Sequence, residues 1–364
     1  MIVASFGNVL LMLMPKQFSF AAQRLAPIRL SLFLLAAFIV CRCSVAQNTP
    51  LLSGGIGFFT NTFDGATSYY PIIGPLAAVP LGKRVLIESR ATLLEDFIPK
   101  GGGQEGYDHI HFVALTYLQA DFIAAPHLTV VGGSFLTPFG TYNERLTPFW
   151  IANFQDGPLI SGLGTMHTGT SLGGQLRGSA VSRRKYSIDY AAYFSARSDN
   201  EQFNAARSSG GRVSLYLPEQ RLEVGTSYGR LLQGTHENFF GVHVWWEPEN
   251  TGLRLRSEWA GGAHGNGYWI EADYRPMQFG GYNSWIGRFE PLFRMQQTFK
   301  TDNHGGDPLP GVNTQRADFG LDYNFPHNTR ILTSYSRQFS SAKDVNIWET
   351  GVTYRFLFPA WKGR

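Results

Sequence analysis

The side chains with the clearest chemical meaning in this sequence are charged groups spaced two residues apart. In "LRLRSEW" (253–259), Arg254, Arg256 and Glu258 occupy every second position, and mostly apolar residues lie between them. Arg316 and Asp318 repeat this spacing near the C-terminus. Arginine and carboxylate groups aligned on one face can line a wet surface and hold ions or hydrogen-bonding solutes there. The spacing therefore predicts an extended charged surface rather than a single reactive centre.

Metal binding and hydrolysis are the two other chemistries that the sequence could support. His109 and His111 would share one face of a strand, beside Asp108, but no third metal ligand is identifiable. A hydrolase would need a nucleophile paired with a histidine, and nothing in the spacing of the serines and His243 identifies one. We therefore expect neither an enzyme nor a bound metal or other cofactor.

Composition and the placement of charge argue against a nucleic-acid-binding protein and separate the first residues from the rest. Charged residues make up 16% of the 364 residues, against roughly 25% in a soluble domain, and aromatic residues reach 14%. Four of the 31 basic residues lie in residues 1–46, which hold none of the 27 acidic ones. The remainder is formally neutral, so no nucleic-acid partner is expected.

The N-terminal 46 residues are predicted to be a cleaved signal peptide. Arg24 and Arg29 precede the apolar stretch "LSLFLLAAFIV" (30–40), which is too short to span a bilayer as a helix. Small residues in "SVAQ" (44–47) would allow cleavage after Ala46, and a membrane anchor is the alternative. Both cysteines, Cys41 and Cys43, lie in this leader, so the exported chain would have no disulfide.

The elements that carry the charged positions are strands. Residues 47–364 alternate between apolar and polar side chains in segments of about 9–15 residues, the length of a tilted strand that crosses a membrane. Short, often proline-containing connections such as 217–220 and 276–281 alternate with longer polar ones such as 61–66, 198–208 and 261–266. This pattern predicts an all-β fold, a transmembrane antiparallel β-barrel of about 16 strands with short periplasmic turns and long outer loops.

The C-terminal segment "WETGVTYRFLFPAWKGR" (348–364) is expected to close the barrel. Large residues, among them Trp348, Tyr354 and Phe358, occupy alternate positions and would face lipid, where aromatic side chains prefer the two interfaces. The segment resembles the C-terminal assembly signal of bacterial outer-membrane proteins, which ends in an aromatic residue. Here "PAWKGR" follows Phe358, so residues 359–364 are predicted to form a periplasmic tail.

The segment "VVGGSFLTPFGTYNERLTPFW" (130–150) resembles a stretch of porins of the phosphate-selective O/P type. The matching residues are Gly133, Phe135, Pro138, Phe139, Gly140, Glu144 and Arg145, and "GGQLRGS" (173–179) is similar to the next strand of such proteins. The resemblance implies a sixteen-stranded, trimeric porin whose third outer loop folds into the pore. Residues 138–166 are by position that loop, which would present Glu144, Arg145 and Asp156 at the constriction. There the loop is expected to meet wall arginines such as Arg84, Arg90 and Arg177.

The expected pore lining mixes both signs of charge. The inner face is predicted to carry Arg84, Glu88, Arg90, Arg177, Asp189, Arg254, Arg256, Glu258, Arg288, Glu290, Arg316 and Asp318. A wider set on the same face comprises Arg212, Arg221, Glu223, Glu271, Asp273, Arg294 and Glu349. Phosphate selectivity, which needs a predominance of basic side chains, therefore does not carry over, and about half of these charges are expected to pair across strands.

These observations predict an outer-membrane porin, a passive channel for small hydrophilic solutes and ions. Its expected partners are outer-membrane lipids and lipopolysaccharide, the barrel-assembly machinery, two further copies in a homotrimer, and small anions or other hydrophilic solutes. An outer-membrane barrel enzyme of the lipase or protease type and a structural or adhesive barrel are the alternatives. Strand number separates them, because a barrel of about 16 strands leaves an aqueous channel whereas smaller barrels are filled.

Overall fold

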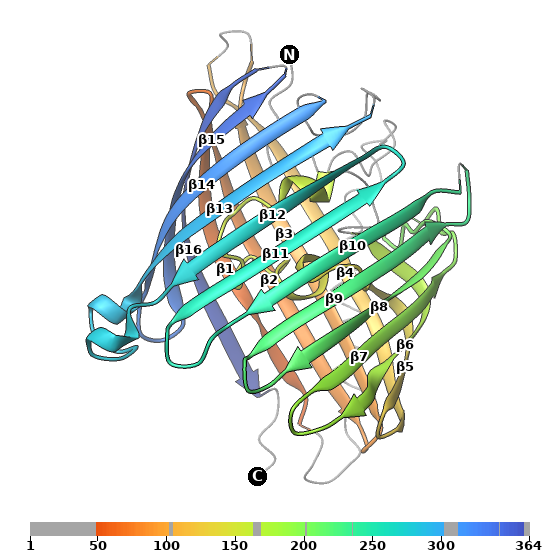
Figure 1. The fold of residues 1–364 in the computed structure, drawn as a ribbon. Coiled ribbons are helices and arrows are strands. Elements are labelled where there is room, and N and C mark those ends of the chain that lie inside the picture. Colours follow the sequence, from red (N-terminus) through yellow and green to blue (C-terminus); the bar gives the residue numbers. More distant parts are fainter. Residues whose placement is uncertain are drawn as a thin grey trace.

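The chain folds into a closed antiparallel β-barrel of sixteen strands (Figure 1). The computed structural model describes residues 49–101, 105–162, 169–200, 202–234, 236–301, 312–341 and 343–359. Each strand pairs with its neighbours along the chain, and β1 (Leu51–Phe63) pairs with β16 (Val345–Pro359) to close the sheet. The predicted fold class and strand number are confirmed. The predicted signal peptide lies outside the described residues, as do residues 360–364 of the predicted tail.

The remaining strands follow one another around the barrel. They are β2 (Ala66–Leu81), β3 (Val85–Pro99), β4 (Tyr107–Ala125), β5 (Leu128–Leu136), β6 (Thr170–Ser182), β7 (Ser187–Ser195), β8 (Ser208–Leu217), β9 (Leu222–Leu231), β10 (Asn238–Trp246), β11 (Leu253–Gly262), β12 (Gly265–Tyr274), β13 (Phe289–Lys300), β14 (Asn313–Asn324) and β15 (Thr329–Ser340). Short helical turns interrupt the connections: α3 (Tyr142–Arg145), η1 (Leu159–Gly162), η2 (Met277–Phe279) and η3 (Ile286–Arg288). Among the described residues, no helix is long and apolar enough to cross a membrane.

The two faces of the sheet differ in chemistry, as the sequence pattern predicts. Along β14, Arg316 and Asp318 are buried inside the barrel, whereas Phe319 and Leu321 are exposed on the outside. Along β16, Glu349 is buried and its neighbour Trp348 is 57% exposed. Because successive side chains of a strand point to opposite faces, the closed sheet has a charged interior and an apolar exterior. This is the arrangement of a transmembrane barrel.

A β-bulge in β4 changes which side chains of that strand face outward. The register of β3 and β4 shifts by one residue, so that Arg90 pairs with Tyr117 but Ala91 pairs with Leu115, which leaves Thr116 as the extra residue. Sequence alternation would place Phe112 on the outer face together with Phe122. Instead Phe112 pairs with Leu94, which packs against the inner cluster of the barrel. A bulge reverses the facing of the residues beyond it.

The connections form two groups, as expected, with three differences. The predicted long connections near 61–66 and 261–266 are tight turns, because the strands extend to Phe63 and Gly262 and resume at Ala66 and Gly265. The predicted short connection at 276–281 is longer, because β12 and β13 are separated by residues 275–288, which form η2 and η3. In Figure 1 this segment projects away from the barrel wall at the end that carries the short turns.

Candidate functional site

The connection between β5 and β6 enters the barrel and contacts its inner wall on opposite sides. It runs from Thr137 to Gly169, and α3 lies inside the barrel in Figure 1. Residues 163–168 of this connection are outside the described ranges. The described part, residues 137–162, is called the inner loop below. Polar contacts hold it to strands from β8 to β15, and aromatic contacts hold it to β1 and β2.

Glu258 on β11 binds the start of α3. Its Oε2 accepts hydrogen bonds from the backbone N–H groups of Thr141 at 3.0 Å and Tyr142 at 3.3 Å. The helix has no cap from the Thr141 side chain, so the wall carboxylate takes that place. Gly140 precedes this helix with φ +61°, and a Cβ there would lie 1.9 Å from Glu258 Oε1. Only glycine allows the backbone to approach the carboxylate so closely.

Two ion pairs fix α3 to the wall. Glu144 lies 2.5 Å from Arg212 on β8, whose Nη1 also donates to the Gly140 carbonyl at 2.7 Å. Arg145 donates to both carboxylate oxygens of Glu223 on β9, at 2.8 and 3.0 Å. The Arg145 guanidinium also lies over the Trp245 ring, 5.4 Å from its centroid. Bidentate and stacked arginine contacts are directional, so they define the position of the helix as well as its distance from the wall.

The second half of the inner loop binds the charged wall formed by β12–β15. The Asp156 carboxylate lies 2.7 Å from Arg316 Nη1, and its backbone carbonyl accepts a hydrogen bond from Arg294 at 3.0 Å. Asn153 Nδ2 donates to Glu271 and Asp273, each at 3.0 Å. Arg330 on β15 donates to the Ala152 carbonyl. These contacts join backbone and side-chain groups of the loop to a polar network in the wall.

The tip of the inner loop lies against a glycine patch on β1 and β2. A Cβ at Gly55 would lie 2.8 Å from the Trp150 ring, and one at Gly74 would lie 2.5 Å from it. Phe149 packs beside Phe59 and Tyr70, with ring centroids of Phe149 and Phe59 5.9 Å apart. Small residues on the wall therefore make the space that the two loop aromatics occupy.

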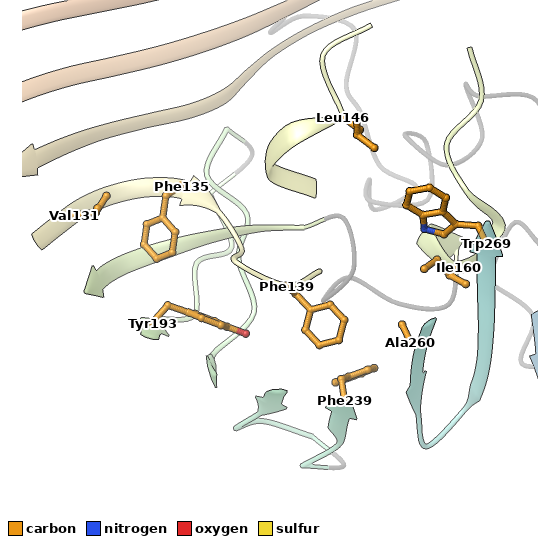
Figure 2. Close-up of a cluster of buried hydrophobic side chains, with 9 residues drawn as sticks. All are labelled: Val131, Phe135, Phe139, Leu146, Ile160, Tyr193, Phe239, Ala260 and Trp269. Carbon is orange, nitrogen blue, oxygen red and sulfur yellow. The ribbon is translucent and has the colours of Figure 1, made fainter. Parts of the chain in front are cut away.

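An apolar cluster fills the space between the base of the inner loop and the wall (Figure 2). Phe139, Leu146 and Ile160 come from the loop, and Trp269 of β12 lies beside Ile160 in Figure 2. Tyr142 packs edge-on against Trp269, with ring centroids 6.5 Å apart. Burial raises the pKa of the Tyr142 phenol, so its side chain stays neutral. The inner loop is thus held by apolar packing as well as by charge.

Charged residues of the wall pair with one another in a continuous network. Arg256 lies 2.8 Å from Glu271 and 2.6 Å from Asp273, and Arg254 contacts Asp273 and Glu290. Asp318 accepts from Arg294 at 2.8 Å and from Arg316 at 2.5 Å. Pairs of this kind offset the cost of removing each charge from water.

The twelve wall positions predicted from the sequence fall into three groups. The wall network just described and the loop contact of Glu258 account for Arg254, Arg256, Glu258, Glu290, Arg316 and Asp318. On the opposite wall, Arg177 pairs with Asp121, Glu88 accepts from Gln119, Asp189 accepts from Ser179 and Arg90 donates to Thr147 of the inner loop at 3.2 Å. Arg84 lies in the exposed β2–β3 turn and Arg288 ends η3, so neither lies on a strand.

Most charged partners of the inner loop belong to the predicted lining, but they are not the arginines expected to meet it. We expected the loop to meet Arg84, Arg90 and Arg177, but of these only Arg90 contacts it. Its arginine partners are instead Arg212, Arg294, Arg316 and Arg330. The glycines Gly55 and Gly74 carry a usable signal, since glycine at alternate positions of a strand indicates a close approach by another segment.

His109 and His111 lie on the outer face of β4, on either side of Glu95. Each imidazole contacts one oxygen of the Glu95 carboxylate. Within the described ranges, no group of three or more His, Cys, Asp or Glu side chains is arranged to hold a metal ion. The two histidines are therefore bound to a strand neighbour on the outside of the barrel, away from the inner loop.

Comparison with known proteins identifies the fold only. No protein-family model and no curated protein matches the chain. Among solved structures, OmpF of Salmonella typhi has a TM-score of 0.58 and 12% identity over 85% of this chain and 98% of that one. OprB of Pseudomonas putida has 0.56 and 10% over 85% and 94%. The anion-selective porin of Comamonas acidovorans has 0.55 and 11% over 85% and 100%.

Proposed function

We propose that this protein is an outer-membrane porin, a passive channel for small hydrophilic solutes and ions. The observation that carries the proposal is the inner loop, which ion pairs and hydrogen bonds hold against the polar interior of a sixteen-stranded barrel. A loop outside the barrel could not narrow it, whereas one that contacts opposite walls reduces the cross-section available to a solute. Charged and hydrogen-bonding side chains on both the loop and the wall would replace part of a solute's hydration.

Weak charge selectivity is part of this proposal. The predicted lining mixes arginines with carboxylates, and most of the wall arginines have an acidic partner at close range. Paired charges largely cancel at a distance, so the bias between anions and cations would come from the few unpaired groups near the inner loop. Phosphate selectivity is therefore not proposed.

The proposed location is the bacterial outer membrane, with export through the predicted signal peptide. An apolar outer face in contact with outer-membrane lipids and lipopolysaccharide, and insertion by the barrel-assembly machinery, would follow from that location. A homotrimer is proposed on the resemblance noted in the sequence. The interior of the barrel favours a channel over a filled barrel enzyme. Its described polar side chains pair with one another in the wall network, and no nucleophile–histidine pair is evident among them.

Conductance in a planar lipid bilayer tests the proposal. The purified protein should open discrete channels, and deletion of residues 146–160 should raise their conductance because it removes the loop tip and Asp156. A shorter deletion within the β7–β8 connection, which lies on the same side of the barrel, should leave conductance nearly unchanged. Absence of channels, or equal conductance for both deletions and the native chain, would contradict the proposal.

A further inference from the structure

The connection between β12 and β13 is unlike the others at its end of the barrel. It spans residues 275–288 and forms η2 and η3, whereas the turns 218–221 and 325–328 at the same end have four residues each. Three of its aromatic side chains are exposed to an unusual degree: Phe279 at 62%, Tyr282 at 54% and Trp285 at 69%. Large apolar side chains gathered on a surface mark a contact with another apolar phase or molecule.

The charge pattern of this segment is that of a membrane interface. Residues 276–287, "PMQFGGYNSWIG", contain no charged side chain, and Arg275 and Arg288 flank them. The Arg275 guanidinium lies over the Tyr282 ring at 4.6 Å and 3.8 Å from the inward-facing Glu290, and Tyr282 lines a small polar cavity with Arg221 and Glu247, so this pair lies at the inner rim of the barrel. In the described part of the chain, Arg288 forms no ion pair with an acidic residue. Aromatic residues bordered by basic ones suit the boundary between acyl chains and phosphate headgroups.

One of the exposed aromatic side chains, Trp285, continues the outer face of the barrel. Trp285 contacts Phe289 at a centroid distance of 6.2 Å, Phe289 contacts Tyr323 at 4.8 Å, and Tyr323 contacts Phe325 at 4.7 Å. Phe289 and Tyr323 lie on the outward face of β13 and β14, since their neighbours Glu290 and Asp322 are buried inside. A ladder of rings therefore links the segment to the surface that faces lipid.

We infer that residues 276–287 form an interfacial anchor that inserts Phe279 and Trp285 into the lipid leaflet at the short-turn end of the barrel, where Arg288 meets lipid phosphates. The inference rests on the membrane location in the proposed function. A lipid surface fits better than a protein partner, because the segment extends an apolar outer face and projects sideways from the wall (Figure 1) rather than beneath the lumen. Its role would be to fix the depth and tilt of the barrel.

A single-cysteine probe tests the anchor. Asn283 is exposed between the aromatic residues, and Asn283→Cys leaves all three rings in place. The full chain, with Cys41 and Cys43 changed to serine, would carry an environment-sensitive fluorophore at this cysteine in vesicles of phosphatidylethanolamine and phosphatidylglycerol. Quenching would be measured with a lipid nitroxide near the headgroups and with aqueous iodide. Glu219→Cys, in an exposed turn at the same end, is the aqueous control, and Val352→Cys on β16 is the lipid control.

If the anchor lies in the membrane, we expect strong nitroxide quenching and weak iodide quenching at position 283, and the reverse at position 219. Changing Phe279 and Trp285 together to serine should make the fluorophore at position 283 accessible to iodide. Equal iodide quenching at 283 and 219 in the native background would overturn the anchor, as would energy transfer between copies labelled at 283 without nitroxide quenching. If nitroxides on the acyl chains also failed to quench a fluorophore at position 352, the proposed membrane location itself would be wrong. This outcome distinguishes a failure of the proposed function from a failure of the anchor alone.

Discussion

Arg90 is the charged residue of the wall whose substitution is most informative about selectivity. Its guanidinium donates to Thr147 of the inner loop and lies over Tyr117, and among the described residues it has no acidic partner. An unpaired charge beside a constriction dominates the local potential, because the low-dielectric wall focuses its field. Arg90→Glu should therefore shift the reversal potential in a salt gradient toward cation selectivity.

The control for this prediction is Arg184→Glu, which makes the same change of charge in the exposed β6–β7 turn. It should move the reversal potential much less than Arg90→Glu. Equal shifts from both variants would mean that net charge rather than local position sets the selectivity. Arg177→Glu should also shift the potential toward cations, since it removes the partner of Asp121 on the same wall.

Glu258 is the wall residue on which the position of α3 depends most directly. Glu258→Ala would leave the N–H groups of Thr141 and Tyr142 without their acceptor in a buried place. We expect a loss of about 1–3 kcal/mol in the free energy of unfolding, the cost of unsatisfied buried donors, together with greater noise in the open-channel current. Glu258→Gln keeps an acceptor oxygen of similar shape and should lose less. Quiet channels and unchanged stability in Glu258→Ala would show that the inner loop is held elsewhere.

At the residue scale, the sequence predicts which wall positions carry charge but not which charges meet. Arg316 and Asp318 are two residues apart, so strand alternation alone places them on one face. Their partners Asp156 and Arg294 depend on where a long loop folds and on the register of neighbouring strands. Neither is encoded in local spacing, which is why Arg330 was not predicted to contact the loop.

At the scale of single strands, an arginine on the outer face should destabilise the barrel. Leu321 is 42% exposed on the outward face of β14, between Pro291 and Thr333 of the adjacent strands. Leu321→Arg should lower the free energy of unfolding from lipid vesicles by roughly 2–4 kcal/mol if the site lies near the bilayer midplane. Leu321→Ile, the apolar control, should change it little. Equal stabilities of the two variants would contradict a lipid-facing position.

The inward face of the sheet tolerates fewer substitutions than strand alternation alone predicts. From the sequence, Gly351 faces water beside the outward Val352, so a charged side chain there would be harmless. In the structure a Cβ at Gly351 would lie 2.1 Å from the Phe59 ring. Aromatic side chains occupy the space next to the inner-face glycines of β1, β2 and β16. Packing rather than hydration therefore decides which substitutions these positions tolerate.

The glycine patch on β1 and β2 should determine where the tip of the inner loop lies. Gly74→Ala would place a methyl group 2.5 Å from Trp150, which must then move, and overpacking of this kind costs about 1–3 kcal/mol. We expect lower stability and altered single-channel conductance. The control is Gly132→Ala on β5, where a Cβ has no atom within 4 Å. If both variants behaved alike, the contact between Trp150 and the wall would not restrain the loop.

At the element scale, strands were predicted well, whereas interruptions of strands were not. Alternation identifies β14 and β16 and their outward faces, because a closed sheet between water and lipid requires it. The bulge at Thr116 cannot be recognised from the residue types of β4, so strand alternation assigns Phe112 to the wrong face of the sheet. The segment 275–288 begins with proline and glycine signals that resemble a short turn, and its η2 and η3 turns appear only in three dimensions.

For the whole molecule, the inner loop and the wall form one mechanical unit. The loop leaves β5, contacts β8–β15 through ion pairs and hydrogen bonds, and reaches β1 and β2 through Phe149 and Trp150. Contacts on opposite walls restrain both ends of the segment, so its position does not depend on one interaction. A constriction built in this way is expected to be stable rather than to open and close with voltage, since no single ion pair would release it.

The orientation of the barrel in the membrane gives a prediction about the entire chain. The connections that include Asn204 and Asp344 lie at the end of the barrel from which the inner loop enters, whereas Glu219 lies in a short turn at the other end. All three side chains are exposed. Short turns face the periplasm in bacterial outer-membrane barrels.

Cysteines introduced singly at Asn204 and Asp344 should therefore react with a membrane-impermeant maleimide added to intact cells, because the reagent stays on the outer side of the membrane. A cysteine at Glu219 should react only after the outer membrane is made permeable. Reagent that passes through the pore could blur this contrast, so a maleimide carried on a large polymer is the appropriate probe. Labelling at Glu219 alone would invert the barrel and place the anchor segment 276–287 in the outer leaflet, because that segment lies at the same end.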